Sequence, residues 1–222
     1  EISNKELLDL LNRRRKAVVM RVQIWGDVKL RDPEWPCPYL STSKCQKLIN
    51  CKADNGRVLS CDLLETAITD VDLTIILDEY SFEHILVLDS YHAKYGPLPP
   101  PLIKTTESYY RAKTELKGVE GQELYYTKSK NKLNSIYGMM AQDPGKLDVT
   151  YTGVGLLFDS LQTPEQAFAK NADRSFLPYQ WGVWVTAWSR FRLEEGIRLA
   201  HQAKGVDGGF VYCDTDSVKY LG

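Results

Sequence analysis

The sequence predicts an α+β fold, with an antiparallel sheet and packed helices plus a hairpin of two helices. Three observations carry this prediction. Short β-type runs separated by turn residues occupy much of the first 95 residues, a Gly/Pro-rich segment at 96–101 then interrupts the chain, and two helical stretches follow it. A hydrophobic fraction of 43% over 222 residues is enough for a sizeable core.

Before the interruption, the pattern predicts a helix at 3–16, in which Ser3 and Glu6 have the spacing of a capping box. The cationic run at 13–16 suits either the end of that helix, through its dipole, or a contact with DNA. The other elements expected here are a strand at 17–25, a loop at 31–47, a hairpin turn at Asn55-Gly56, a helix at 72–80 and a strand at 83–91.

After the interruption, helices are expected at 102–117 and 121–141, separated by Gly118 and Gly121. Lys and Arg outnumber Glu by seven to four between 104 and 132, although the chain as a whole carries a net charge of −1. Residues 142–180 are rich in turn residues. The last expected elements are a long helix at 181–203, with an aromatic stripe of Trp184, Trp188 and Phe191 assigned to core packing, and a hairpin of strands at 210–213 and 217–220.

Composition excludes several classes of protein. A net charge of −1 argues against a module that binds nucleic acid with its whole surface. No run of eighteen apolar residues and no signal peptide is present, so we expect a cytoplasmic protein without a membrane partner. The five cysteines lack C-x-x-C spacing, which favours reduced thiols over a zinc site.

The first candidate site is the acidic pair Asp214 and Asp216, at the turn of the C-terminal hairpin. Carboxylate oxygens are the ligands that Mg²⁺ takes from proteins, usually together with substrate phosphates. Acidic residues are also common at turns, where they accept backbone hydrogen bonds. The pair alone therefore leaves both interpretations open.

The second candidate site lies on the helix at 121–141. Lys130, Asn134 and Tyr137 have the spacing i, i+4, i+7, so they share one helical face. A cation, an amide and a phenol on one face suit a nucleotide, because Lys can meet phosphate as a point charge. A solvated helix face is the alternative.

The two patterns occur together and in order, K-x-x-x-N-S-x-Y-G at 130–138 and Y-C-D-T-D-S at 212–217. In this combination they resemble motifs B and C of family B DNA polymerases. The segments G-V-W-V-T-A-W-S-R at 182–190 and V-D-L at 71–73 with Glu79-Tyr80 are similar to those of the protein-primed phage type. The likeness is tight over 102–141 and 181–220 and loose over 1–101.

The resemblance implies nucleotidyl transfer from a dNTP to the 3′-hydroxyl of a DNA primer–template, with two Mg²⁺ ions. It implies a palm-type sheet and a fingers hairpin. Asp216 would be the catalytic metal ligand and Asp214 a supporting one. Nucleotide binding is implied for six residues: Lys130, Lys117, Asn134, Ser135, Tyr137 and Gly138.

By position, the resemblance implies four regions. Residues 1–95 correspond to an insertion that contacts the terminal (priming) protein and the template duplex, 96–141 to the fingers with motif B, 142–180 to a second insertion, and 181–222 to part of the palm with motif C. The family's motif A, D-x-x-S-L-Y-P, is absent from these 222 residues. We therefore expect a fragment that is inactive on its own.

Two alternatives differ in class. A glycosyltransferase also uses D-x-D to hold a metal ion and a nucleotide diphosphate, but it leaves the Lys130–Tyr137 face unexplained. A non-catalytic piece would bind DNA or a priming protein through residues 1–95. A D-x-x-S-x-Y-P motif encoded upstream of Glu1 would favour the polymerase.

Overall fold

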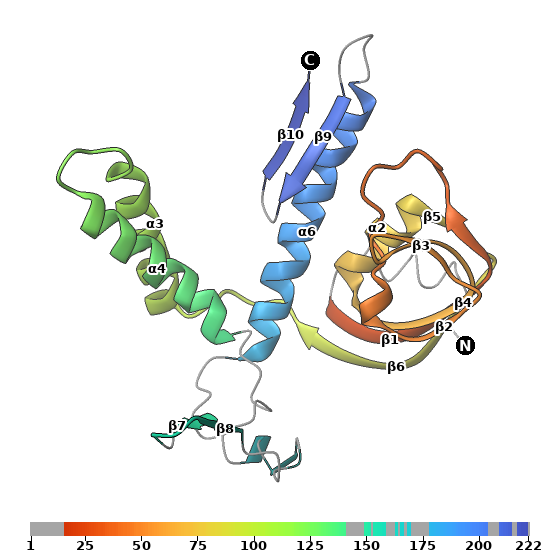
Figure 1. Cartoon of the computed structure of the whole chain (residues 1–222), viewed down its shortest axis with the longest axis horizontal. Coiled ribbons are helices and arrows are strands. Elements are labelled where there is room, and N and C mark those ends of the chain that lie inside the picture. The colour runs from red at the N-terminus through yellow and green to blue at the C-terminus, as the bar shows by residue number, and fades with distance from the viewer. Residues whose placement is uncertain are drawn as a thin grey trace. The chain divides into compact units, whose positions relative to one another are not determined.

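The computed structural model describes residues 16–140, 149–151, 153–158, 163, 165–166, 168–169, 178–203, 209–214 and 217–221. The chain divides into two compact units, residues 1–96 with 186–222 and residues 97–185. Helices and antiparallel strands occur in the described residues, which confirms the predicted α+β class (Figure 1). None of the described helices is long and apolar enough to cross a membrane.

The first unit contains a six-stranded sheet in which every described pairing is antiparallel. Strand β1 lies between the two other long strands, β4 and β6 (Figure 1). The strands are β1 (Lys16–Leu30), β2 (Cys45–Ile49), β3 (Lys52–Asp54), β4 (Arg57–Thr69), β5 (Tyr80–Ser81) and β6 (His84–Lys94). The turn predicted at Asn55-Gly56 joins β3 to β4, so this prediction is confirmed.

The core of the first unit follows from the alternation along β1. Met20, Val22 and Ile24 point to one face and are buried. They share a cluster with Leu73 and Ile76 of α2 (Asp70–Glu79), the helix predicted at 72–80. The sheet thus buries one face against the helix that carries Asp72.

Gly26 is required by the bulge in β1. The register of β1 against β4 shifts between Trp25 and Val28, and Gly26 has φ +87°. A Cβ at this position would lie 2.7 Å from the Cβ of Glu83, whose backbone N–H donates to the Gly26 carbonyl at 3.0 Å. A larger residue would therefore be strained both in its backbone and in its contact.

Two local predictions in this region need correction. Lys16 begins β1, so it does not end a helix, and residues 3–15 of that predicted helix lie outside the described residues. The predicted loop at 31–47 contains a 3₁₀ turn, η1 (Thr42–Lys44), and then the start of β2. Strand β2 is extended because it pairs with β4. The prolines at 31–38 favoured the prediction of a loop, and nothing within 31–47 indicated this pairing.

The second unit contains the predicted helical hairpin, α3 (Pro100–Glu115) packed on α4 (Glu123–Met140). Pro occupies the first turn of α3, where its missing N–H has no helical partner. A two-stranded sheet of β7 (Val149–Tyr151) and β8 (Leu156–Phe158) follows. Most of the predicted turn-rich segment at 142–180 lies outside the described residues.

The long helix α6 (Tyr179–Gln202) and the hairpin of β9 (Gly209–Asp214) and β10 (Ser217–Leu221) match their predictions. Val218 of β10 packs closely against Gly196 of α6. A Cβ at Gly196 would lie 3.1 Å from the Cγ2 of Val218. The missing side chain thus lets the hairpin lie against the helix (Figure 1).

The aromatic stripe of α6 is only half-buried, so its assignment to the core is only partly right. Trp188 and Phe191 pack edge to face with ring centroids 5.5 Å apart. The fully buried positions of this helix include Ala187 and Ile197, which lie on a neighbouring face.

Candidate active site

The acidic hairpin holds Asp214 at the end of β9. Asp214 is exposed and pairs in the ladder with Ser217, whose hydroxyl donates to the Asp214 carbonyl at 3.2 Å. Asp216 and Thr215 lie outside the described residues. The donor types, two carboxylates separated by one residue in the sequence, fit Mg²⁺. Among the described residues, no group of three His, Cys, Asp or Glu side chains could hold a metal ion.

The predicted nucleotide-binding residues Lys130, Asn134, Ser135, Tyr137 and Gly138 all lie on α4 and are exposed. Ser135 donates its hydroxyl to the Asn131 carbonyl at 2.7 Å, a bond within the helix. A Cβ on Gly138 would meet nothing within 4 Å, so the surface is open at this position. These residues are therefore accessible, and Lys130, Asn134 and Tyr137 among them share one face of α4.

The contact between Lys132 and α3 fixes which way this face points. The Lys132 ammonium donates to the Tyr109 hydroxyl at 3.2 Å and lies 5.3 Å from the centre of that ring. Lys130 is two residues earlier, about 200° around the helix. Lys130 is therefore directed away from the Tyr109 side of the hairpin, on the face it shares with Asn134.

Lys117 lies just beyond α3 and is exposed. It precedes Gly118, which has φ +76° in the connection between the two helices. Lys117 and the α4 face belong to the second unit, whereas Asp214 belongs to the first.

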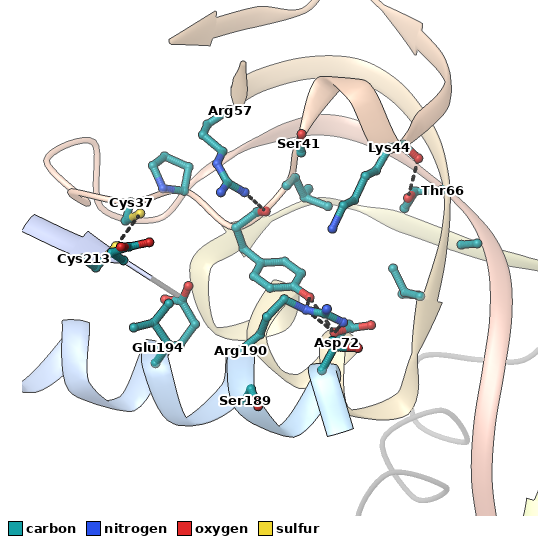
Figure 2. Close-up of a pocket in the computed structure, with 18 residues that line it drawn as sticks. Cys37, Ser41, Lys44, Arg57, Thr66, Asp72, Ser189, Arg190, Glu194 and Cys213 are labelled. Carbon is teal, nitrogen blue, oxygen red and sulfur yellow. Dashed lines mark hydrogen bonds and ion pairs between the residues drawn. The ribbon is translucent and has the colours of Figure 1, made fainter. Parts of the chain in front are cut away.

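A cavity of about 480 Å³ in the first unit was not anticipated from the sequence. At its wall Arg190 of α6 forms an ion pair with Asp72 of α2, with an Nη2–Oδ1 distance of 2.7 Å (Figure 2). The Tyr39 hydroxyl donates to the same Asp72 oxygen and accepts from Arg190 Nε at 2.8 Å. These contacts join three segments of the first unit.

The other oxygen of Asp72 caps α2. It accepts from the Thr69 backbone N–H at 2.9 Å, and the Thr69 hydroxyl accepts from the Asp72 N–H at 3.1 Å. Burial by itself raises the pKa of Asp72, but the Arg190 charge and the hydrogen bonds from Tyr39 and Thr69 hold it below its ordinary value. The carboxylate therefore stays charged although Asp72 is only 5% exposed.

Glu79 and Glu194 form a second buried acidic feature, and each is 6% exposed. Oε2 of Glu79 accepts from the Tyr39 backbone N–H at 2.9 Å. Burial, and then the charge of Glu194, raises the pKa of Glu79 to about 9, and burial also raises the pKa of Glu194. Within the described chain, Glu79 Oε1 and Glu194 Oε2 accept no hydrogen bond, so a proton retained on the pair supplies the missing donor.

This proton makes stability depend on pH. Folding raises the pKa of Glu79, so between about pH 4.5 and 9 the folded chain keeps a proton that the unfolded chain has lost. Stability from this group is therefore greatest below the unfolded pKa and falls as pH rises through this window. Glutamine mimics the neutral acid, so Glu79→Gln should lack this loss of stability. The difference in free energy of unfolding between the variant and wild type should shift in favour of the variant by on the order of 1 kcal/mol for each pH unit between about pH 5 and 8.

Urea unfolding of both proteins at each pH measures this difference. Glu120→Gln is the matched control, because Glu120 is an exposed glutamate in the connection between α3 and α4, and the variant should keep the pH slope of wild type. If the free energy of unfolding depends on pH equally in Glu79→Gln and in wild type, Glu79 is ionised in the folded chain.

The sequence contained partial signals for these buried groups. Thr69-x-x-Asp72 has the spacing of a capping box, and Asp72, Glu79 and Arg190 all fall in segments noted for their resemblance. Nothing local pairs Asp72 with Arg190, which lies 118 residues away.

Comparisons with known proteins give a match by structure alone. No protein-family model matches the sequence, and no curated protein matches it. Phi29 DNA polymerase complexed with primer–template DNA and incoming nucleotides aligns with TM-score 0.62 and 19% identity, covering 92% of this chain and 32% of that one. Its binary complex with primer–template DNA gives TM-score 0.61 and 18% identity, covering 92% and 31%, and its orthorhombic crystal form gives 0.59 and 20%, covering 92% and 32%.

The chain thus spans about a third of the length of the polymerase it matches. At 18–20% sequence identity, the structural likeness establishes the fold alone. The resemblance predicted from the motifs is therefore confirmed at the level of the fold: this chain has the fold of about a third of phi29 DNA polymerase, a family B polymerase of the protein-primed type.

Proposed function

We propose that this chain is part of a DNA-directed DNA polymerase of the protein-primed family B type. The observation that carries the proposal is the fold likeness to phi29 DNA polymerase over 92% of the chain. The location of the motif residues supports it, since K-x-x-x-N-S-x-Y-G lies on the second helix of a hairpin and the described part of Y-C-D-T-D-S lies on a β-hairpin. The fold likeness gives no support to the glycosyltransferase alternative.

The proposed reaction is attack of a primer 3′-hydroxyl on the α-phosphate of a dNTP, with pyrophosphate as the leaving group. Asp216 and Asp214 would hold Mg²⁺, which when bound stabilises the attacking and leaving oxygens. Lys130 and Lys117 would neutralise the triphosphate. Asn134, Ser135, Tyr137 and Gly138 would form the floor beneath the new base pair.

Partners and regions follow from the same proposal. Primer–template DNA and dNTP are the proposed ligands, as in the phi29 complexes. A terminal protein that primes synthesis is a further proposed partner, bound through residues 1–95. Residues 96–141 would act as the fingers, 142–180 as a second insertion and 181–222 as part of the palm.

The coding sequence upstream of Glu1 tests the proposal most directly. A motif D-x-x-S-x-Y-P encoded there, in frame, is the expected result, because a two-metal site needs carboxylates from a second segment. An open reading frame that extends upstream without this motif would contradict the proposal and favour the non-catalytic binding piece.

The purified 222-residue chain should show no nucleotide incorporation. The physical reason is that these residues lack the motif A carboxylate, so the metal ligands are incomplete. Primer extension assayed with Mg²⁺ and all four dNTPs measures this, with phi29 DNA polymerase as the positive control. Robust Mg²⁺-dependent extension by the chain alone would show that its own carboxylates suffice.

A further inference from the structure

Two thiols of the first unit meet beside the acidic hairpin. Cys37 follows β1 in the 31–40 segment, and Cys213 of β9 directly precedes Asp214. Their Sγ atoms are 3.5 Å apart although 176 residues separate them, and both residues are half-buried (Figure 2). We propose that Cys37 and Cys213 form a reversible disulfide, a redox modification site that tethers β9 to the 31–40 segment.

The geometry favours this pair over the other cysteines. A disulfide has an S–S length of about 2.05 Å, so the two sulfurs need to approach by roughly 1.5 Å. The Cys45 thiol instead donates to the Ser41 carbonyl at 3.4 Å and the Cys51 thiol to the Lys52 carbonyl at 3.5 Å. All five cysteines lie in the described part of the chain, and no other pair of them has a sulfur–sulfur hydrogen bond there.

The cavity gives a small oxidant access to the pair. Cys37, Cys213 and Asp214 all line the cavity of about 480 Å³. The oxidant is a low-molecular-weight disulfide, such as oxidised glutathione. One protein thiolate attacks it and releases one reduced glutathione; the second protein thiolate attacks the mixed disulfide and releases another. Two electrons and two protons thus pass from the protein thiols to glutathione.

The burial of the two thiols and their separation in the sequence determine how fast the disulfide forms and how it affects stability. Burial, and then the hydrogen bond with Cys213, raises the pKa of Cys37 to about 12, so little thiolate is present at neutral pH and the exchange is slow. Once formed, the bond closes a loop of 176 residues, which restricts the unfolded chain. Oxidation should therefore raise the midpoint of thermal unfolding and hold the strand that ends at Asp214.

Incubation of the purified chain with oxidised glutathione tests the proposal without any polymerase assay. Free thiols counted in denaturant should fall from five to three per chain, and digestion without reductant should give one cross-linked peptide pair containing Cys37 and Cys213. Dithiothreitol should restore five thiols and the original unfolding midpoint. Five thiols after prolonged incubation, or a cross-link through Cys45, Cys51 or Cys61, would overturn the proposal.

Two variants separate this pair from the other thiols. Cys37→Ser should keep its four thiols and form no intramolecular cross-link, and a loss of two thiols from it would contradict the assignment. The double variant Cys45→Ser/Cys51→Ser should still lose two thiols, through Cys37 and Cys213. If Cys37→Ser does not fold, the double variant decides alone, because digestion of it without reductant shows whether the two lost thiols are joined as Cys37–Cys213 or involve Cys61.

Discussion

Asp216→Ala should abolish nucleotide incorporation by a full-length polymerase that contains this chain. A bound metal ion contributes several kcal/mol of charge stabilisation to the transition state, and each 1.4 kcal/mol is a factor of ten in rate. Loss of the ligand proposed to hold it should therefore lower the rate by about 10³-fold or more. Single-turnover incorporation into a labelled primer–template measures the rate.

The proposed role of Asp216 concerns the metal ion, so DNA affinity should stay nearly unchanged in the variant. Fluorescence anisotropy of the labelled duplex measures this affinity separately. Asp54→Ala is the matched control, since Asp54 is an exposed aspartate at the β3–β4 turn of the same unit. Near wild-type incorporation by Asp216→Ala would mean that the metal assignment is wrong.

Lys130→Ala should raise the apparent KM for the incoming nucleotide and lower the rate of incorporation in the same enzyme. Lys130 is exposed on the α4 face shared with Asn134 and Tyr137, and its proposed partner is the triphosphate. Loss of a charge-assisted contact predicts about 1.5–3 kcal/mol, or roughly a 10- to 150-fold fall in kcat/KM. Steady-state incorporation over a range of dNTP concentrations measures both parameters.

Lys132→Ala is the matched control two residues away. Lys132 is engaged by Tyr109 of α3, so its loss should change kcat/KM by less than about twofold. It should instead destabilise the α3–α4 hairpin by about 0.5–1 kcal/mol through the lost cation–π contact, which urea unfolding measures. Equal kinetic effects of the two variants, or effects confined to DNA affinity, would identify α4 as an electrostatic DNA surface.

Much of the local structure could be predicted from the sequence. The Asn55-Gly56 turn, the proline-initiated helix α3, the glycine-separated helix α4 and the hairpin of β9 and β10 all occur as the sequence indicated. These elements depend on residues within a few positions of one another. Backbone preferences, caps and periodicity act over these few positions, so these elements can be predicted without knowledge of any distant contact.

The part of the candidate site on α4 could also be predicted from residues close together in the sequence. Lys130, Asn134 and Tyr137 lie on one face because helical geometry fixes the relation between positions i, i+4 and i+7. Helical geometry also places Lys132 about 200° around α4 from Lys130, but it could not supply Tyr109 as its partner. That partner comes from a second helix, 23 residues away in the sequence.

Only the tertiary structure decided the features that join distant segments. Strand β2 exists because β4 offers it hydrogen bonds, and Asp72 stays charged because folding brings Arg190 to it. The retained proton on Glu79 and the contact of Cys37 with Cys213 likewise arise from burial beside residues more than 100 positions away. The sequence by itself determined the local helices and strands and the order of the motifs. The ionisation of Asp72 and Glu79, their burial and the contact between the two thiols depend on long-range packing, and a local sequence pattern carries no information about that packing.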